Sequence, residues 1–408
     1  MKLKKKNVNK RSKIVKIAIF ILLFILVGEL IYMGAVKYKR DNDSVYYTFI
    51  NSIIYDSSYI GVGNSDFRYG KSNGLQNYSK ALVNVYNDSF KVNKEVMLSE
   101  GYGSFYNDIA KYDNGYIAVG AIEMTKEHNE NKAGEGLIVK YDRDFNQVSR
   151  KNFKILNDTE FTKVKVLSDG SYIVIGTSVY ESGRIGNHTT GGAIIVKFDK
   201  NDKEVFRANY TGPQAGIFTD ILVLDDGYVV CGSIYNRTGV VVKYSLDGKK
   251  LWNYHYSYTD SVGFTSINKF GDNFILTGSK LDAKDKTDYY KASLVVVDKN
   301  GKKVNEVTYK EDNITRFNNL LVDKDKITVV GVTGRKVDNQ VISDGLVVSY
   351  DKNLKVLDSE KFSYSNNDSY NNIYSFKNGK YLLGFTNSKV RGIKSNGKDY
   401  FPVIMELK

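Results

Sequence analysis

Two carboxylates, Asp108 and Asp220, occupy the same place in two copies of a short phrase, "YNDI" (106–109) and "FTDI" (218–221). Two carboxyl groups that flank one sugar bond can serve as the general acid and the general base of glycoside hydrolysis. The pair therefore indicates a candidate glycan-active site, provided that the fold brings both phrases to one channel.

The same position is polar in every copy of the phrase, and it carries Ser52, Asp108, Lys163, Asp220, Ser266, Asn319 and Asn372. No arginine falls in this column, which argues against a sialidase, because a sialidase site uses several arginines. The alternative interpretation is a ring of polar groups at the mouth of a solvated channel, which requires no chemistry. We predict no catalytic residue, and we take these column members as candidate ligand-binding residues: Asp108, Lys163, Asp220, Asn319 and Asn372.

The sequence indicates neither a metal site nor a cofactor. Its three histidines, at 128, 188 and 255, have no common ligand spacing, and Cys231 has the apolar neighbours of a buried small hydrophobe. Turns rich in Asp and Asn, such as "FDKNDK" (198–203), raise the question of calcium. They lack the distal glutamate of an EF-type loop and recur at one hairpin, so we expect ordinary turn chemistry.

The residues above must be positioned by a repeated unit. The phrase "GYIAVG" (115–120) returns almost unchanged as "SYIVIG" (171–176) and "GYVVCG" (227–232). Aligned on their first aromatic or aliphatic residue, seven copies begin at Tyr59, Tyr116, Tyr172, Tyr228, Phe274, Ile327 and Tyr381. A glycine closes the first six copies in register, and in the seventh it comes one residue early, at Gly384.

These glycines do not form a nucleotide-binding loop, because none is followed by the helix that such a loop requires. We expect each of them to permit a β-bulge or a close backbone approach in a buried strand. An apolar run follows each phrase, and a turn then leads to a fourth run with aromatics, best seen as "LWNYHY" (251–256). Short β-branched and aromatic runs bounded by Asp, Asn and Gly predict strands joined by tight hairpins.

Four strands per unit and a spacing of 46 to 57 residues predict an all-β fold, a seven-bladed β-propeller of four-stranded blades over residues 45–408. A stack of β-solenoid coils is the rival architecture, but its repeats are shorter and lack the four-strand rhythm. The last unit ends inside its third strand, so we expect residues 43–48 to supply the missing outer strand.

The segment "DDGYVVCGSIYNRTGVVVKYSLDGKKLWNYHYS" (225–257) resembles the repeat of exported bacterial propeller proteins, with its "DGGYIVVG … IVKYDSNGNKLW" cadence. The resemblance extends over about residues 45–408. It implies a cell-surface or secreted propeller and brings no established catalytic residue. The chain has a single tryptophan, Trp252, whereas the propeller of a quinoprotein dehydrogenase repeats tryptophan in most blades.

The first 44 residues predict a membrane anchor. A basic head (1–13) precedes an apolar run of 23 residues (14–36), and a linker (37–44) leads to the propeller. At about 1.5 Å per residue such a helix crosses a hydrocarbon core of about 30 Å. Eight Lys or Arg lie at or before Lys16 and three follow the run, which predicts a cytoplasmic N-terminus and an exported propeller. A cleaved signal peptide is the alternative, although Met33 fits the cleavage rule poorly.

The net charge of +13 belongs mainly to this N-terminal region. Residues 1–40 hold 11 basic groups and one acidic group, which leaves 48 basic and 45 acidic groups in the rest of the chain. The high pI is therefore a topology signal, and we do not expect nucleic acid as a partner.

The segments between the second and third strands of each unit indicate a binding face. Six of them are long: 64–80, 123–135, 178–191, 280–292, 335–344 and 388–400. They carry Tyr69, Tyr78, Tyr180, Tyr289, Tyr290 and Tyr400. Tyrosine offers rigid contact area and a hydroxyl, which suits the binding of sugars or peptides.

Our hypothesis is a single-pass protein of a bacterial cell membrane that binds a protein or a cell-wall polysaccharide and performs no catalysis. The alternative is a propeller glycan hydrolase or lyase that uses Asp108 and Asp220.

Overall fold

The computed structural model describes residues 45–69, 76–98, 103–123, 134–156, 158–179, 191–212, 216–234, 238–256, 262–281, 290–324, 326–337, 340–377, 379–387 and 400–407. All regular structure in these ranges is β-strand, and none of it is a helix long and apolar enough to cross a membrane. The predicted head, span and linker (1–13, 14–36 and 37–44) lie outside the described residues. By its internal contacts the chain divides into two compact units, Met1–Val45 with Phe67–Asn77 and Tyr46–Asp66 with Tyr78–Lys408.

Apart from Val45 and the residues 67–69 and 76–77, the described strands lie in the second unit, and consecutive strands pair into meanders. The first three meanders comprise β1 (Val45–Tyr55), β2 (Tyr59–Tyr69), β3 (Gln76–Tyr86) and β4 (Val92–Met97); β5 (Gly103–Tyr112), β6 (Gly115–Glu123), β7 (Gly134–Asp142) and β8 (Gln147–Phe153); and β9 (Asp158–Val166), β10 (Tyr172–Val179), β11 (Gly191–Phe198) and β12 (Glu204–Gly212).

The next three comprise β13 (Gly216–Leu224), β14 (Gly227–Ile234), β15 (Thr238–Tyr244) and β16 (Lys250–His255); β17 (Val262–Phe270), β18 (Asn273–Leu281), β19 (Tyr290–Val297) and β20 (Lys303–Tyr309); and β21 (Ile314–Asp323), β22 (Lys326–Val337), β23 (Gln340–Asp351) and β24 (Val356–Phe362). The last sheet has three described strands, β25 (Asp368–Phe376), β26 (Gly379–Thr386) and β27 (Phe401–Leu407).

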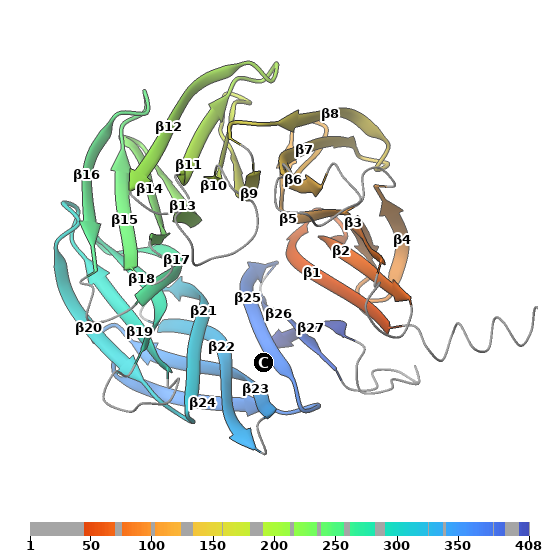
Figure 1. Cartoon of the computed structure of the whole chain (residues 1–408). Helices are drawn as coiled ribbons and strands as arrows, with labels where there is room; N and C mark the ends of the chain where they lie inside the picture. The colour runs from red at the N-terminus through yellow and green to blue at the C-terminus, as the bar shows by residue number, and fades with distance from the viewer. Residues whose placement is uncertain are drawn as a thin grey trace, which may run out of the picture. The chain divides into compact units, whose positions relative to one another are not determined.

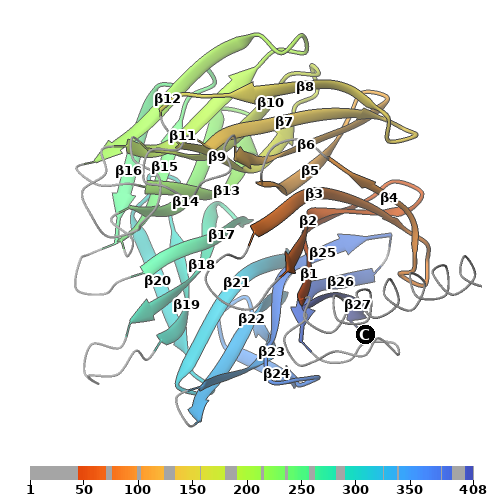
Figure 2. The same cartoon turned by 45° about the vertical axis from the view of Figure 1, so that its right-hand side comes forward.

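The meanders follow one another around a centre, and the first strand of each lies innermost (Figure 1). Figure 2 shows that each sheet is twisted and faces its neighbours in the chain order. This arrangement is a β-propeller, and each meander is one of its blades. Two neighbouring blades are joined into an eight-stranded sheet by one parallel residue pair, Ser79 with Gly103, and two others by the pair Tyr290 with Ile314.

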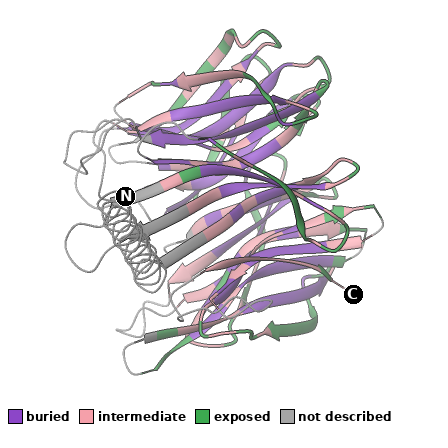
Figure 3. Cartoon of the chain, turned by 90° about the vertical axis from the view of Figure 1, so that its right-hand side faces the viewer, coloured by how far each residue is buried: buried purple, intermediate pink, exposed green. Residues whose placement is uncertain are grey.

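The middle strands of each blade are buried on both faces, which explains their continuous apolar runs. In β14, Tyr228 and Val230 pack against the preceding blade, whereas Val229 and Cys231 pack against the following one. This alternation is the two-residue period of a strand. Figure 3 shows buried residues along the middle strands and exposed residues along the outer ones.

The apolar residue that begins each four-residue phrase of the "FTDI" type packs at a boundary between blades. Phe218 of β13 packs with Ile173 and Ile195 of the preceding blade and has no exposed surface. At the boundary between the first and last sheets, Ile50 packs in one cluster with Leu383. The hydrophobic core is therefore divided into clusters between sheets, as the repeated column predicts.

The glycines that close the phrases of the "GYIAVG" type are confirmed as points of close backbone approach. A Cβ added to Gly232 would lie 2.0 Å from the carbonyl oxygen of Ile217 on the neighbouring strand. The same clash, at 1.9–2.0 Å, would arise at Gly63, Gly120, Gly176, Gly331 and Gly384.

The alignment of the seventh copy was wrong by one residue. Gly384 pairs with Tyr370 just as Gly232 pairs with Phe218, and the hairpin pair of Phe376 with Gly379 matches that of Leu224 with Gly227. Lys380, not Tyr381, therefore occupies the first position of the seventh copy, where most other copies have an aromatic residue. The neighbouring tyrosine concealed the true register.

Two of the predicted long loops are largely strand. In the segment 335–344 the ladder of β22 and β23 continues to the pair Val337 with Gln340. Tyr69 ends β2 and Tyr78 lies within β3, so neither belongs to a loop. Polar residues can extend a paired hairpin beyond the core, because the ladder hydrogen bonds do not require apolar side chains. The central parts of the other four segments lie outside the described residues.

The predicted closure of the last blade was also wrong. Residues 45–48 belong to β1, the innermost strand of the first blade, and do not pair with β27. The backbone N–H of Thr48 donates to the carbonyl of Tyr400, which precedes β27. Among the described strands none covers the outer edge of β27, and its residues are mostly half-buried, unlike the buried third strands elsewhere.

Candidate functional site

Each innermost strand from β5 onward carries a β-bulge one residue before the predicted polar column. In β13 the pairing with β14 passes from Phe218 directly to Asp220, so that Thr219 has no partner on the neighbouring strand. The same skip occurs at Asn107, Thr162, Thr265, Asn318 and Asn371. A bulge bends the strand and re-aims the side chain of the extra residue.

The bulged side chains connect neighbouring blades. Thr219 Oγ1 donates to the carbonyl of Phe264, the apolar residue that opens the phrase in the next blade, at 2.9 Å. The same bond runs from Asn51 to Tyr106 (2.7 Å), Asn107 to Phe161 (2.9 Å), Thr162 to Phe218 (2.6 Å), Thr265 to Phe317 (2.9 Å) and Asn318 to Tyr370 (2.8 Å). These bonds give the backbone carbonyls beside the bulges a side-chain donor from the neighbouring blade.

Sequence reasoning missed this role, although its signal was present. The second letter of "INSI", "YNDI", "FTKV", "FTDI", "FTSI", "FNNL" and "YNNI" is Asn or Thr in every copy. Both residue types combine a short side chain with a hydrogen-bond donor.

Asp108 accepts hydrogen bonds from both neighbouring blades. It accepts a hydrogen bond from the hydroxyl of Ser52 at 2.5 Å and another from the backbone N–H of Val164 at 3.0 Å. The Nζ atom of Lys163 lies 3.8 Å from its Oδ1 atom. Its exposed fraction is 6%. Burial alone would lower the pKa of Lys163, but its electrostatic interactions with Asp108 and, to a smaller extent, with Tyr374 and Asp220 outweigh this, and the pKa lies above its ordinary value.

Asp220, two blades further on, is bonded to the following blade and to its own strand. It accepts from Ser266 Oγ at 2.8 Å, from Ile267 N at 3.1 Å and from Ile221 N at 2.9 Å. Both carboxylates are thus engaged by hydroxyl and backbone donors, an arrangement that holds adjacent blades together. These contacts form part of a ring of polar groups, but both carboxylates are buried and not exposed at the mouth of a solvated channel.

The asparagines of the column continue this ring. Asn319 Nδ2 donates to Asn372 Oδ1 at 2.8 Å, and Asn372 Nδ2 donates to the carbonyl of Asn51 at 2.8 Å. The structure therefore brings together the predicted column residues, but mostly in pairs across blade boundaries.

A half-buried carboxylate, that of Glu160 on β9, accompanies one of the bulges. Asn107 Nδ2 donates to Glu160 Oε1 at 2.8 Å, in addition to its bond with Phe161. Burial raises the pKa of Glu160; the bond from Asn107 offsets part of this effect, and the neighbouring Asp158 adds to it.

The variant Glu160→Gln is expected to be more stable than the parent at pH 7 and equally stable near pH 4. A carboxyl whose pKa is raised on folding destabilises the fold while it is ionised, and this cost disappears below the unfolded pKa of about 4.3. Thermal unfolding at the two pH values measures the difference, and Glu95→Gln on the exposed strand β4 is the control. A gain that persists unchanged at low pH would contradict this account.

The Asp-rich turns are confirmed as turns. Asp199 Oδ1 accepts the backbone N–H groups of Asn201 and Lys203, both at 2.9 Å, and Asp298 and Asp351 repeat the pattern. Within the described ranges no three His, Cys, Asp or Glu residues gather in a way that could hold a metal ion. Cys231 is fully buried, as predicted, whereas the histidines at 128 and 188 lie outside those ranges.

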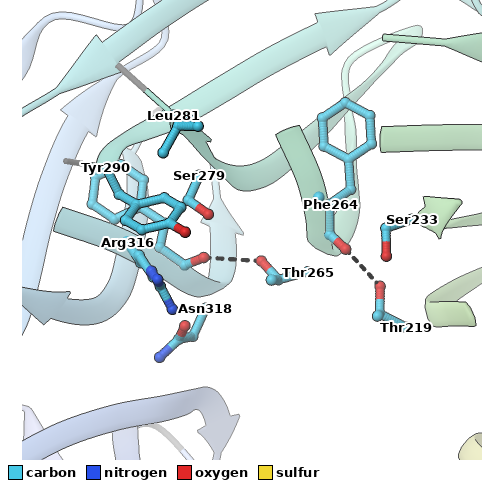
Figure 4. Close-up of a pocket in the computed structure, with 11 residues that line it drawn as sticks. Thr219, Ser233, Phe264, Thr265, Ser279, Leu281, Tyr290, Arg316 and Asn318 are labelled. Atoms are coloured by element: carbon cyan, nitrogen blue, oxygen red, sulfur yellow. Dashed lines mark hydrogen bonds between the residues drawn. The ribbon is translucent and has the colours of Figure 1, made fainter. Parts of the chain in front are cut away.

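A cavity of about 350 Å³ opens beside the bulges of β13, β17 and β21 (Figure 4). It is lined by Thr219, Ser233, Gly263, Phe264, Thr265, Ser279, Leu281, Tyr290, Arg316, Phe317 and Asn318. Leu281 ends the second strand of its blade and Tyr290 begins the third, so the cavity lies on the face where these strands connect. We call this the long-loop face.

Of the predicted tyrosines that the structure describes, Tyr290 alone lines this cavity. Tyr400 packs against Phe49 and Phe385, with ring centroids 5.7 Å apart in each case. The tyrosines at 180 and 289 lie outside the described residues, and Tyr69 and Tyr78 lie in strands. The sequence pattern did not point to Arg316, because this residue lies two positions before the bulge and outside the polar column.

The similarity of this chain to known proteins is weak. No protein-family model matches the chain, and neither does any curated protein sequence. Among solved structures, YjhT is similar with a TM-score of 0.41 and 10% identity over 76% of this chain and 97% of that one. An endo-arabinanase from Bacillus licheniformis has a TM-score of 0.32 and 12% identity over 61% and 95%.

Semaphorin 1b of Drosophila, extracellular domains 1–2, has a TM-score of 0.34 and 7% identity over 60% of this chain. The match covers about half of the semaphorin chain, 54%.

Proposed function

We propose that this protein is a binding module that recognises a protein or a cell-wall polysaccharide through its long-loop face and performs no catalysis. The observation that carries the proposal is a contrast between two sets of polar groups. Asp108 and Asp220 are engaged by donors of adjacent blades, whereas the cavity on the long-loop face is lined by an exposed arginine and several hydroxyls.

The proposal includes a ring of seven blades carried by one membrane-spanning helix. Seven hydrophobic clusters lie between consecutive sheets, and one of them joins the first sheet to the last, which supports the count. The apolar run 14–36, with its excess of basic residues on the N-terminal side, supports an anchor that places the propeller outside a bacterial cell.

A screen of the purified full-length chain against envelope polymers tests this function. We expect retention on at least one polymer or envelope protein without any turnover. The alternative, a glycan hydrolase or lyase, predicts turnover that the changes Asp108→Asn or Asp220→Asn abolish in a folded protein. Such turnover would overturn the proposal.

The same protein tests the topology when it is expressed with an epitope tag before Lys2. Protease added to intact protoplasts should digest the propeller and leave the tag. Loss of the tag would mean the opposite orientation, and a mature chain without residues 1–35 would mean that the anchor is cleaved.

A further inference from the structure

The cavity on the long-loop face is lined at one point by a glycine, where the neighbouring blades carry a side chain. Gly263 stands immediately before Phe264 on β17, whereas the same place holds Ile217 on β13 and Arg316 on β21. A Cβ added to Gly263 would meet only the Cβ of Ser233, at 3.6 Å, which is an ordinary contact. A Cβ therefore fits at Gly263 without a clash, unlike at Gly232 and its equivalents, where a Cβ would strike the backbone.

Arg316 gives the cavity a positive charge. Its guanidinium carbon lies 4.0 Å from the centre of the Tyr290 ring, and Figure 4 shows the two side chains together at one end of the cavity. None of the eleven lining residues is acidic, and no ion pair joins Arg316 to any carboxylate in the described part of the chain. The stacked guanidinium therefore keeps its N–H donors for a ligand, and their planar fork matches a carboxylate.

The rest of the polar lining is uncharged. Ser233 and Ser279 have no hydrogen-bond partner for their hydroxyls among the residues that the structure describes. The hydroxyls of Thr219 and Thr265 donate to backbone carbonyls (Figure 4) and retain a lone pair that can accept. Hydroxyls that both donate and accept, placed around a cavity, complement a ligand that itself carries several hydroxyls.

We propose that this cavity binds a carboxylate-bearing sugar residue, a uronate unit of an acidic polysaccharide. The inference rests on the proposed binding function and names its ligand class. Arg316 would donate hydrogen bonds to the carboxylate, and the serine and threonine hydroxyls would form hydrogen bonds with the hydroxyls of the sugar ring. An acidic peptide side chain would engage Arg316 but would leave the hydroxyls unpaired, which favours the sugar. The volume is near the lower end of the roughly 300–1,000 Å³ of small-ligand sites, which suits a short segment of the polymer.

Calorimetric titration of the full-length chain with tetragalacturonate, its methyl ester and tetraglutamate tests the inference. We expect the acid to bind at least about tenfold more tightly than the ester, because a charge-assisted hydrogen bond is lost in the ester. Arg316→Gln should weaken the binding of tetragalacturonate by about tenfold or more, and Gly263→Leu should abolish it by filling the cavity. Arg335→Gln removes the same charge from an exposed site on β22 and should leave the binding unchanged.

Gly263→Ala is the milder variant, and thermal unfolding establishes that each variant folds. Equal binding of the acid and the ester, or full binding by folded Arg316→Gln, would overturn the inference. Failure of tetragalacturonate to bind would do the same, as would tighter binding of tetraglutamate, which would indicate an acidic protein partner. If folded Gly263→Leu is still retained on an envelope polymer, the binding function survives and this cavity is not its site.

Discussion

Replacement of Phe218 by alanine is expected to lower the free energy of unfolding by about 3–5 kcal/mol, the usual cost of deleting a buried aromatic ring. Phe218 is completely buried between two blades, where its ring packs near Tyr210 and Tyr244. Its removal would leave a cavity at a boundary that neither blade can close alone, because the paired strands keep the spacing between the sheets. Urea unfolding followed by circular dichroism measures the loss.

Leu251→Ala is the matched control for this measurement. Leu251 lies on the outer strand β16 of the same blade, and 54% of its surface is exposed. Truncation of an exposed aliphatic residue usually changes stability by no more than about 0.5 kcal/mol. Similar losses in the two variants would show that the apolar column does not seal the boundary between blades.

The change Asp108→Ala is expected to cost about 3–5 kcal/mol, the range found when one partner of a buried ion pair is removed. It would leave the hydroxyl of Ser52 and the backbone N–H of Val164 without an acceptor, and Lys163 without its nearest carboxylate. Each buried donor without a partner costs about 1–3 kcal/mol. The loss therefore spreads over three blades, and chemical unfolding should detect it as a lower midpoint.

Two companion variants separate this structural role from a catalytic one. Asp358→Ala, on the exposed outer strand β24, should be nearly neutral. Ser52→Ala removes only one of the donors to Asp108 and should cost less than Asp108→Ala. A stable Asp108→Ala protein would contradict the polar ring, and a stable Asp108→Asn protein that has lost turnover would favour the hydrolase.

The repeat itself was readable because its determinants are local. Period-two alternation of apolar residues, turn-forming Asp and Asn, and a glycine at a fixed place each act within one hairpin. These signals predicted the strands of the blades and the close approach at Gly232. The register of the seventh copy failed where the local pattern was ambiguous, since Lys380 replaces the expected aromatic residue beside Tyr381.

The roles of the polar residues depended on which blades meet. Asp108 has its partners at Ser52 and Val164, each 56 residues away in the chain. From the sequence, a carboxylate in the column was compatible with an acid–base pair or with a ring of polar groups at the mouth of a solvated channel, and the polar ring was the favoured interpretation. Only the positions of neighbouring innermost strands in space show which donors face it.

The sequence by itself thus determined the all-β repeat, the blade-forming strands and the polar column, because hairpins obey short-range rules. Tertiary structure alone decided that the column bonds one blade to the next, and that a cavity opens where Gly263 lacks a side chain. Arg316 and Tyr290 contact each other across two blades, although 26 residues separate them in the chain. A contact of this kind depends on how neighbouring blades pack, which no local pattern encodes.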